Sequence, residues 1–475
     1  MREGLLSDLA AVVGGPQVLA RPADLASYSF DAFGASGERH LPDAVVFPAS
    51  TEEVSGVVQV CARHGCAVVP RGAGTGYAGG AIPLGGGVVV NLCRMSRVLA
   101  LDGSAMRIDV EAGVLTATVH RRAAAGGLYY PPDPGSSTTS TIGGNIACNA
   151  AGPHALRYGT TADFLTGVTA VLADGRIARV GETDADQHFL RLLAGSEGTL
   201  AIVTEARLRL IPAPAARSTV AATFASMEGA ANAVAAIAQS RLVPAALEFL
   251  DGAAVAAVAR AGASAVARGV GALVLVEVEG DAATTGDHTD SIRSAMEHAG
   301  SDHIEVAADS AAAARLWAMR KAISAAVATV MIGKVNEDVV VPRDRIAELV
   351  ARTHQLGDAH AVPVVNFGHL GDGNLHATFL IDPRRKGDRE RGDAAAAELF
   401  ECVLDMGGSL SGEHGVGYTK LAYVERQLGA GTVALMRRIK QALDPQGLLN
   451  PGKKIPPLAT EAAPPAVVAA AAARR

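Results

Sequence analysis

The sequence predicts an α+β protein that is divided into two or three domains. The chain has 475 residues, more than a single hydrophobic core usually organises. Up to Pro212 and Pro214, short apolar strands alternate with helices, and these prolines mark a linker and a first domain boundary. Beyond them a strand–helix–strand alternation recurs, which predicts helices on one face of an antiparallel sheet.

Composition and charge exclude several classes of protein. Hydrophobic residues make up 49% of the chain and charged residues 19%, which is typical of a globular protein and not of a disordered one. The net charge of −6 gives no indication of nucleic acid or an anionic membrane as a partner. We see no apolar run of transmembrane length and no apolar signal core near the N-terminus. We therefore expect a cytoplasmic protein, with peripheral attachment at the inner face of a membrane as the alternative.

The cysteines argue against a disulfide framework or an iron–sulfur cluster. Their number is odd, and none of them forms a Cys-x-x-Cys pair. They are Cys61, Cys66, Cys93, Cys148 and Cys402.

The first elements are a helical approach segment and the start of a compact unit. Residues 1–42 are expected to form a short helix and a polar stretch. A domain over 43–214 then opens with a strand at 44–47. Ser50 is a typical N-cap for a helix over 51–64, which has acidic residues in its first turn.

A glycine-rich loop, PRGAGTGYAGG, follows the next strand at 67–69. It contains G-x-G-x-x-G at Gly74, Gly76 and Gly79, but a dinucleotide-binding Rossmann motif would need a helix directly after it. The chain continues instead into a strand at 88–92. Glycines permit close backbone approach, and successive N–H groups can form an anion-binding nest. The loop suits a diphosphate, with an ordinary turn as the alternative.

A second polar stretch, PPDPGSSTTSTIGGNIACNAAG, spans 131–152, after a strand at 106–111 and a helix over 116–126. Its backbone and hydroxyl donors could wrap a large polar cofactor. The alternative is a long disordered loop, but Ile142 and Ile146 indicate an ordered one.

A hairpin and a further strand complete the first domain. The strands at 165–172 and 176–180 are joined by an Asp-Gly turn. The segment GSEGTL leads into a strand over 201–210.

The second domain is expected over 215–430. It has predicted strands at 219–224, 245–249 and 272–279, with helices between and after them. A helix from 311 to about 330 places Arg320 and Ser324 on one face. A helix over 343–356, a C-terminal segment over 431–458 and a disordered Ala/Pro-rich tail over 459–475 follow.

Two separate stretches contain side chains suited to a metal. His369 and His376 flank a Gly-Asp-Gly turn in VNFGHLGDGNLH, and Glu413 and His414 are adjacent in SGEHGVG. Two imidazoles and a carboxylate make a three-ligand set for a divalent metal such as zinc, with a coordination position left open for substrate. The alternative is that these histidines are ordinary residues of a strand–turn–strand unit.

With these pieces in order, the chain resembles the FAD-linked D-2-hydroxyacid dehydrogenases, which have the FAD-binding fold of the vanillyl-alcohol-oxidase (VAO/PCMH) type. This family includes glycolate oxidase catalytic subunits, D-lactate dehydrogenases and D-2-hydroxyglutarate dehydrogenases. The resemblance covers roughly residues 40 to 455. It rests on the ordered motifs PRGAGTGYAGG, IGGNIACNAAG, GSEGTLAIVTEA, GHLGDGNLH, SGEHGVG and LDPQGLLNPGK.

The resemblance implies a two-subdomain FAD-binding domain, a substrate (cap) domain and a C-terminal segment that returns to the FAD. Members with covalent flavin carry a His in or near the first loop, where this chain has Tyr77, so non-covalent FAD is expected. The implied FAD contacts are Arg71, Gly72, Gly74, Thr75, Gly76, Gly79, Ser137, Gly143, Gly144, Asn145, Asn149, Gly152, Gly198, Ile202, Val203 and Asn450.

The family's metal ligands fall on His369, His376 and Glu413. Its substrate-contacting groups fall on Arg320, Ser324, Lys334, Thr378 and His414. Ser324 and Thr378 depart from the family's pattern, which indicates a different substrate, and the sequence around Lys334 permits a shift of a residue or two.

The implied reaction is oxidation of a D-2-hydroxy acid, such as D-lactate, glycolate or D-2-hydroxyglutarate, to the 2-oxo acid with hydride transfer to flavin N5. Arg320 would bind the carboxylate and His414 would be the general base or, alternatively, a hydrogen-bonding neighbour of the metal site. A quinone, a cytochrome or an electron-transfer flavoprotein would accept the electrons. The chain could associate as a homodimer. The alternative functions are an accessory flavin subunit of a glycolate-oxidase-type complex and a flavin-dependent transferase of the alkyl-ether-lipid-synthase type.

Overall fold

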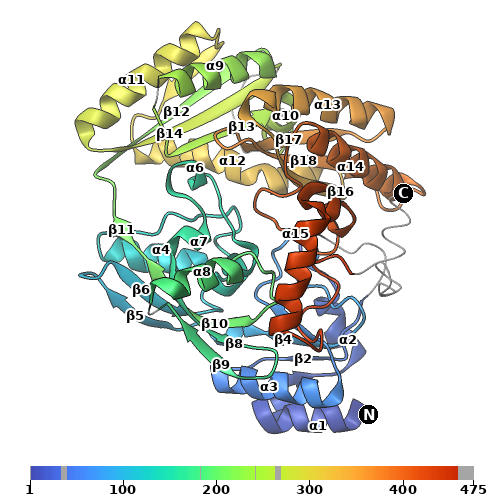
Figure 1. The fold of residues 1–475 in the computed structure, drawn as a ribbon. Helices are drawn as coiled ribbons and strands as arrows, with labels where there is room; N and C mark the ends of the chain where they lie inside the picture. Colours follow the sequence, from blue (N-terminus) through green and yellow to red (C-terminus); the bar gives the residue numbers. More distant parts are fainter. Residues whose placement is uncertain (1, 34–39, 182, 241, 263–268, 458–475) are drawn as a thin grey trace.

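The computed structural model describes residues 2–457 except 34–39, 182, 241 and 263–268. Figure 1 shows the N-terminal half, in blue to green, below the cap domain, in yellow to orange. Helix α15 (Leu421–Leu443) runs down from the cap domain beside the N-terminal half. The predicted tail over 459–475 lies outside the described residues.

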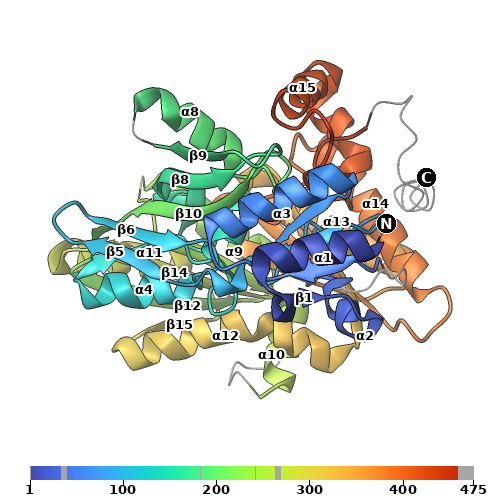
Figure 2. The ribbon, with the colours of Figure 1, turned by 90° about the horizontal axis from the view of Figure 1, so that it is seen from below.

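The first subdomain is built on a four-stranded sheet of order β1-β2-β4-β3. Its last three strands are parallel and β1 pairs antiparallel with β2. Helices α1 and α3 pack on it through aliphatic residues, and Figure 2 shows the two helices side by side from below. The bounds are α1 Arg2–Val13, β1 Val18–Leu19, α2 Pro22–Leu25, β2 Ala44–Val46, α3 Thr51–His64, β3 Val68–Arg71 and β4 Val88–Asn91. Short 3-10 turns lie at Gly15–Gln17, Ala26–Tyr28 and Leu92–Arg94.

The second subdomain is a five-stranded antiparallel sheet of order β5-β6-β10-β8-β9, with a two-stranded β7–β11 ladder beside it. The strands are β5 Val98–Asp102, β6 Arg107–Glu111, β7 Leu128–Tyr129, β8 Leu165–Val171, β9 Ile177–Val180, β10 Ile202–Arg209 and β11 Ile211–Pro212. The helices are α4 Thr116–Ala125, α5 Ile142–Cys148, α6 Ala155–Tyr158, α7 Thr161–Phe164 and α8 Asp184–Leu193.

The cap domain contains a seven-stranded antiparallel sheet of order β15-β12-β14-β13-β17-β18-β16. The strands are β12 Ala216–Phe224, β13 Ala246–Asp251, β14 Ala272–Gly280, β15 His303–Val306, β16 Gly333–Val340, β17 Val364–His369 and β18 Asn374–Ile381. The helices are α9 Met227–Gln239, α10 Gly252–Arg260, α11 Ala282–His298, α12 Ser310–Val330, α13 Ile346–Ala359 (after a 3-10 turn at Arg343–Arg345) and α14 Asp388–Asp405.

Helices cover both faces of this sheet, so the prediction of helices on one face was wrong. Helices α9, α11, α13 and α14 share one core with side chains such as Val274 and Val276 of β14. Helices α10 and α12 share a second core with Leu273 and Leu275 of the same strand. Because successive side chains of a strand point to opposite faces, a strand that is apolar at every position needs cover on both sides.

Most predicted elements are confirmed to within a few residues. Helix α3 matches its prediction, and the Ser50 hydroxyl accepts a hydrogen bond from the backbone N–H of Glu53 at 3.2 Å. The elements that were not predicted include β5, α5, α8, β15 and β16. Among the described residues, we find no helix both long and apolar enough to cross a membrane.

Candidate active site

A cavity of about 650 Å³ lies where the two subdomains meet the cap domain. The glycine-rich loop, the 133–150 stretch and residues 196–203 line it from the N-terminal half. Helix α12, the strands β16 to β18 and the loop that carries Glu413 and His414 line it from the cap domain. Its volume lies in the range of cofactor and substrate pockets.

Most of the predicted FAD contacts line this cavity; the exceptions are Gly79, Asn149, Gly152 and Asn450. Asn149 caps α5 in a left-handed conformation, and the backbone of Gly152 packs against Asp133. The Asn450 side-chain amide donates to the backbone carbonyls of Gly80 and Glu197. These residues thus lie behind the lining, where they support loops that face the cavity.

The lining of the cavity fits a large phosphate-bearing cofactor. A Cβ atom at Gly72 would overlap the Thr141 hydroxyl, and one at Gly74, where φ is +72°, would overlap the Arg71 guanidinium. Gly198 also has a positive φ, of +71°. Glycine, which lacks a Cβ atom, permits this close packing, and such a loop can bring its backbone near a phosphate.

The predicted metal ligands come together at the cap side of the cavity. His369 ends β17 and His376 lies on β18, and their Nε2 atoms each lie 3.5 Å from Oε1 of Glu413. The candidate ligand atoms of the three residues all lie within 4.8 Å of one another. His369 Nε2 and Glu413 Oε2 are buried and have no hydrogen-bond partner among the described residues. Buried polar atoms that converge without partners are the arrangement that a divalent cation would satisfy.

Charges around these ligands shift their pKa values. Burial disfavours protonated His369, but the carboxylates of Glu248 and Glu413 outweigh burial and hold the His369 pKa well above its usual value. Burial likewise opposes ionisation of Glu413, yet the neighbouring histidines, His369 first, lower its pKa to about 2. Burial and the adjacent His414 lower the pKa of His376 to about 3. A cation would replace the proton on His369, so metal binding would release a proton.

A buried carboxylate that sequence reasoning missed orients two of the predicted residues. Glu248 on β13 is fully buried, and its carboxylate lies 2.5 Å from His369 Nδ1. Its other oxygen accepts from Arg320 Nε at 2.7 Å. A carboxylate behind a ligating imidazole fixes the tautomer and direction of the ring. The signal in the sequence was a charged residue inside the apolar strand ALEFLD, since such residues are rarely buried without a partner.

Four side chains form a stack at the centre of the site. The His414 ring lies between those of Tyr77, at 5.0 Å and 27°, and His376, at 5.1 Å and 20°. The Lys334 ammonium lies 5.2 Å from the Tyr77 ring centroid. Tyr77 belongs to the glycine-rich loop, so this loop reaches the candidate metal site as well as the predicted diphosphate site.

The other predicted substrate residues occupy different places. Arg320 and Ser324 line the cavity from α12, whereas Lys334 and Thr378 are not part of the lining. Thr378 is buried and donates to Asn336 Oδ1 at 2.7 Å, and Asn336 faces the cavity. Asn336 follows Lys334 by two residues, within the shift that the sequence permitted there; the sequence did not single it out, because the strand that carries it, β16, was not predicted.

Comparisons with known proteins agree with this architecture. Residues 42–181 match the family model described as an FAD binding domain, and residues 213–454 match that of the C-terminal domain of FAD linked oxidases. Glycolate oxidase subunit GlcD of Bacillus subtilis is 36% identical and covers 90% of this chain and 91% of its own length. A D-lactate dehydrogenase of Anaerostipes hadrus is 35% identical, over 87% of this chain and 89% of its own.

Solved structures with the same fold belong to flavoproteins of the VAO/PCMH type. A 4-ethylphenol oxidase from Gulosibacter chungangensis superimposes with a TM-score of 0.81 at 21% identity, over 97% of this chain and 98% of its own. An alkyldihydroxyacetonephosphate synthase gives a TM-score of 0.74 at 18% identity, over 94% and 84%. These likenesses show the fold alone. The two family models and the relatives at 35–36% identity show more: the chain belongs to the FAD-linked oxidases and is an FAD-dependent oxidoreductase.

Proposed function

We propose that the protein oxidises a D-2-hydroxy acid to the 2-oxo acid, using FAD and a divalent metal. One observation carries this proposal: the ligand atoms of His369, His376 and Glu413 converge in the cavity that the predicted FAD loops line. Relatives named glycolate oxidase subunit and D-lactate dehydrogenase support the substrate class.

FAD would be held by the glycine-rich loop from Arg71 to Gly76, by Ser137 and Gly143–Asn145, and by Gly198, Ile202 and Val203. Bound FAD supplies the acceptor for a hydride from the α-carbon. A divalent cation, zinc being the one best matched by two imidazoles and a carboxylate, would be held by His369, His376 and Glu413. It would supply Lewis-acid polarisation of the substrate oxygens.

Arg320 would bind the substrate carboxylate. Glu248 accepts from Nε of Arg320, so the terminal nitrogens of the guanidinium are left for a second carboxylate. The guanidinium also lies 5.0 Å from the Phe367 ring centroid, which holds its plane from one side. A planar guanidinium held in this way binds a carboxylate through two parallel hydrogen bonds.

His414 would accept the hydroxyl proton. Its Nδ1 is buried and lacks a hydrogen-bond partner among the described residues. The ring is held by the stack between Tyr77 and His376, so it can present a nitrogen in a fixed direction. The hydroxyl proton would thus go to the imidazole of His414.

A quinone, a cytochrome or an electron-transfer flavoprotein would then accept the electrons in the cell. This acceptor would distinguish a dehydrogenase from an oxidase that uses oxygen.

The test is anaerobic bleaching of the flavin absorbance by D-lactate, L-lactate, glycolate, and D- and L-2-hydroxyglutarate, each before and after treatment with a metal chelator. We expect glycolate or at least one of the D-acids to bleach the flavin. The L-isomer of an active D-acid should bleach it far more slowly. The chelator should stop the bleaching without releasing FAD. Bleaching that survives complete metal removal would contradict the metal-dependent mechanism.

A further inference from the structure

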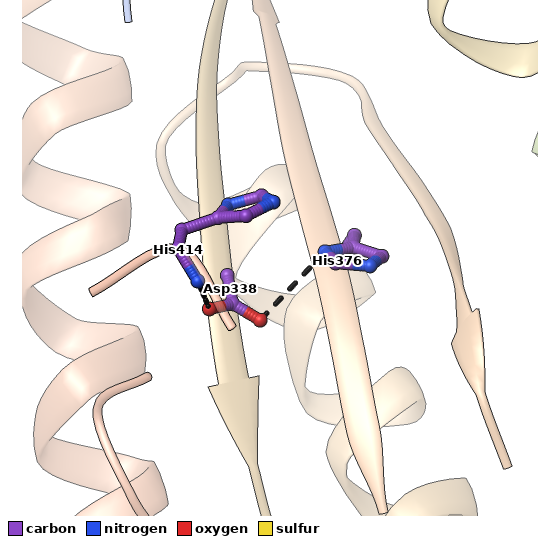
Figure 3. A group of neighbouring side chains, drawn as sticks. All are labelled: Asp338, His376 and His414. Carbon is purple, nitrogen blue, oxygen red and sulfur yellow. Dashed lines mark hydrogen bonds and ion pairs between the residues drawn. The ribbon is translucent and has the colours of Figure 1, made fainter. Parts of the chain in front are cut away.

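One carboxylate oxygen of the cap sheet accepts several hydrogen bonds from the loop at 411–417. Oδ2 of Asp338, on β16, accepts hydrogen bonds from Ser411 Oγ at 3.0 Å and from the backbone N–H groups of Gly412, Glu413 and His414 at 2.9, 2.9 and 2.8 Å. Figure 3 shows the bond to His414, with Asp338 between His414 and His376. Asp338 thus binds the backbone of both residues that the mechanism takes from this loop.

The other oxygen of Asp338 faces the neighbouring strand. Oδ1 accepts from the Asn374 side-chain amide at 2.5 Å and lies 3.8 Å from Nδ1 of His376. Asp338 pairs directly with His376 in the β16–β18 register, which explains this proximity. The same carboxylate therefore lies next to one proposed metal ligand, His376 on the neighbouring strand, and binds the backbone of another, Glu413 in the loop.

A second buried carboxylate holds the far end of the loop from the FAD-binding side. Glu197, with φ of +55°, accepts from the N–H groups of Val416 at 2.8 Å and Gly417 at 2.7 Å. It lines the cavity next to the predicted FAD contact Gly198. The loop is thus fixed at one end by the cap domain and at the other by the FAD-binding half.

The glycines of the loop show how closely it fits. A Cβ atom at Gly412 would overlap the Asn374 amide, and one at Gly415 would lie 2.8 Å from Oε1 of Glu197. One at Gly417 would overlap the backbone carbonyl of Ala78, in the glycine-rich loop. A larger residue at these positions would push the loop away from its anchors.

We propose that Asp338 is the positioning residue that places Glu413 and His414 for metal binding and proton transfer, with Glu197 as the second anchor of their loop. The inference rests on the proposed function, because it takes Glu413 as a ligand and His414 as the base. The physical reason for the proposal is that several N–H donors converge on one oxygen of Asp338. An ionised carboxylate suits such an arrangement, because its hydrogen bonds are about twice as strong as those of a neutral acceptor.

The experiment measures zinc affinity on the FAD-loaded protein by competition with a chromophoric chelator, together with FAD content and the rate of flavin reduction. The variants are Asp338→Ala, Asp338→Asn and Gly412→Ala. The control is Asp251→Asn: Asp251 is equally buried on β13 and accepts four hydrogen bonds, from Ala254 N, from Asn366 N and Nδ2, and from His354. It lines no part of the active-site cavity.

We expect Asp338→Ala to weaken zinc binding by about 10- to 100-fold, the usual effect of losing a group that orients a ligand. Asp338→Asn should weaken zinc binding less, because the side-chain carbonyl of the new asparagine can still accept hydrogen bonds from the loop. The Asn374 amide can also rotate so that its Oδ1, which has no partner among the described residues, accepts from the new NH₂ group. Asp251→Asn should leave zinc affinity and FAD content unchanged.

Gly412→Ala separates position from charge, because it keeps every charge in place and displaces the loop. We expect it to weaken zinc binding like Asp338→Ala. The positioning role is wrong if Gly412→Ala binds zinc with normal affinity, or if the zinc affinity of Asp338→Asn equals that of Asp251→Asn. These two comparisons remain decisive even if Asp338→Ala fails to fold. The proposed function fails on a different result, namely flavin reduction in the unmodified protein that does not need metal.

Discussion

At the scale of single residues, the candidate site depends on buried carboxylates that orient functional side chains. Glu248 holds His369 and Arg320 through its two oxygens, and Asp338 holds the loop with Glu413 and His414. The two carboxylates come from different strands, β13 and β16. Each of them fixes a residue that binds substrate or metal in our proposal.

Replacing Arg320 with Lys tests the carboxylate-binding role. A lysine keeps the charge but gives a point charge in place of a planar pair of donors. Losing one charged hydrogen bond of about 1.5–3 kcal/mol should raise KM by roughly 10- to 150-fold. The measurement is steady-state kinetics with the best 2-hydroxy acid, and the exposed Arg315→Lys on the same helix is the control. An unchanged KM in Arg320→Lys would remove Arg320 from the substrate site.

The sequence indicated the metal and substrate candidates but not the residues that orient them. His369, His376 and Glu413 are found from motif chemistry, since imidazoles and carboxylates near glycine turns suit a metal. Glu248 lies inside an apolar strand and Asp338 lies in a strand that was not predicted, and the partners of both are distant in sequence. Only the sheet register, which pairs Glu248 with His369 and Asp338 with His376, brings these residues together.

At the scale of elements, the glycine-rich loop combines two roles. Its glycines pack closely against side chains, and its Tyr77 reaches the stack at His414. The sequence predicted a loop for a diphosphate here and rejected a Rossmann motif because a strand follows. Strand β4 follows the loop and pairs in parallel with β3.

Replacing Gly72 with Ala should lower the amount of FAD bound to the purified protein. The added methyl group would overlap the Thr141 hydroxyl, so the loop would have to move away from the second FAD-binding stretch. Gly85→Ala is the matched control, because Gly85 is exposed and a Cβ there meets nothing within 4 Å. The ratio of flavin to protein absorbance gives the result; equal ratios for the two variants would contradict the assigned role of this loop.

Elements were predictable where local signals were strong. The Ser50 cap and the acidic first turn predicted α3, and the Asp-Gly turn predicted the hairpin of β8 and β9. Strand β16 was missed because its sequence, GKVNEDVV, has buried polar residues at positions that normally face water. Of these residues, Asn336 lines the cavity, Asp338 accepts hydrogen bonds from the loop at 411–417, and Glu337 lies 3.8 Å from the ammonium of Lys420.

At the scale of the whole molecule, a network of charged groups joins the cap domain to the N-terminal half. His154 Nδ1 lies 2.9 Å from Asp133, and its Nε2 lies 3.0 Å from Glu277 on the cap strand β14. Tyr158 donates to Glu279 of the same strand at 2.6 Å. These contacts cross the boundary that Pro212 and Pro214 indicated, so the two halves do not associate through apolar surface alone.

The network predicts a loss of stability at high pH. Burial opposes protonation of His154, but Asp133 and Glu277 outweigh it and raise its pKa to about 10. An unfolded histidine has a pKa near 6.5, so the stabilisation is complete below about pH 6.5 and is lost as pH rises towards 10. Urea unfolding across this range should show a falling stability that His154→Gln largely abolishes. The exposed His303→Gln serves as control; the same pH dependence in His154→Gln and the unmodified protein would show that His154 does not bridge the halves.

The most direct test of the whole account is the anaerobic rate of flavin reduction in His376→Ala, measured beside bound zinc and bound FAD. The control is His360→Ala, a histidine paired with Glu398 outside the cavity lining. We predict that His376→Ala keeps its FAD, loses zinc and no longer transfers hydride from the 2-hydroxy acid, while His360→Ala behaves like the unmodified protein. Flavin reduction at the normal rate in His376→Ala would contradict the claim that these side chains hold a metal at the flavin.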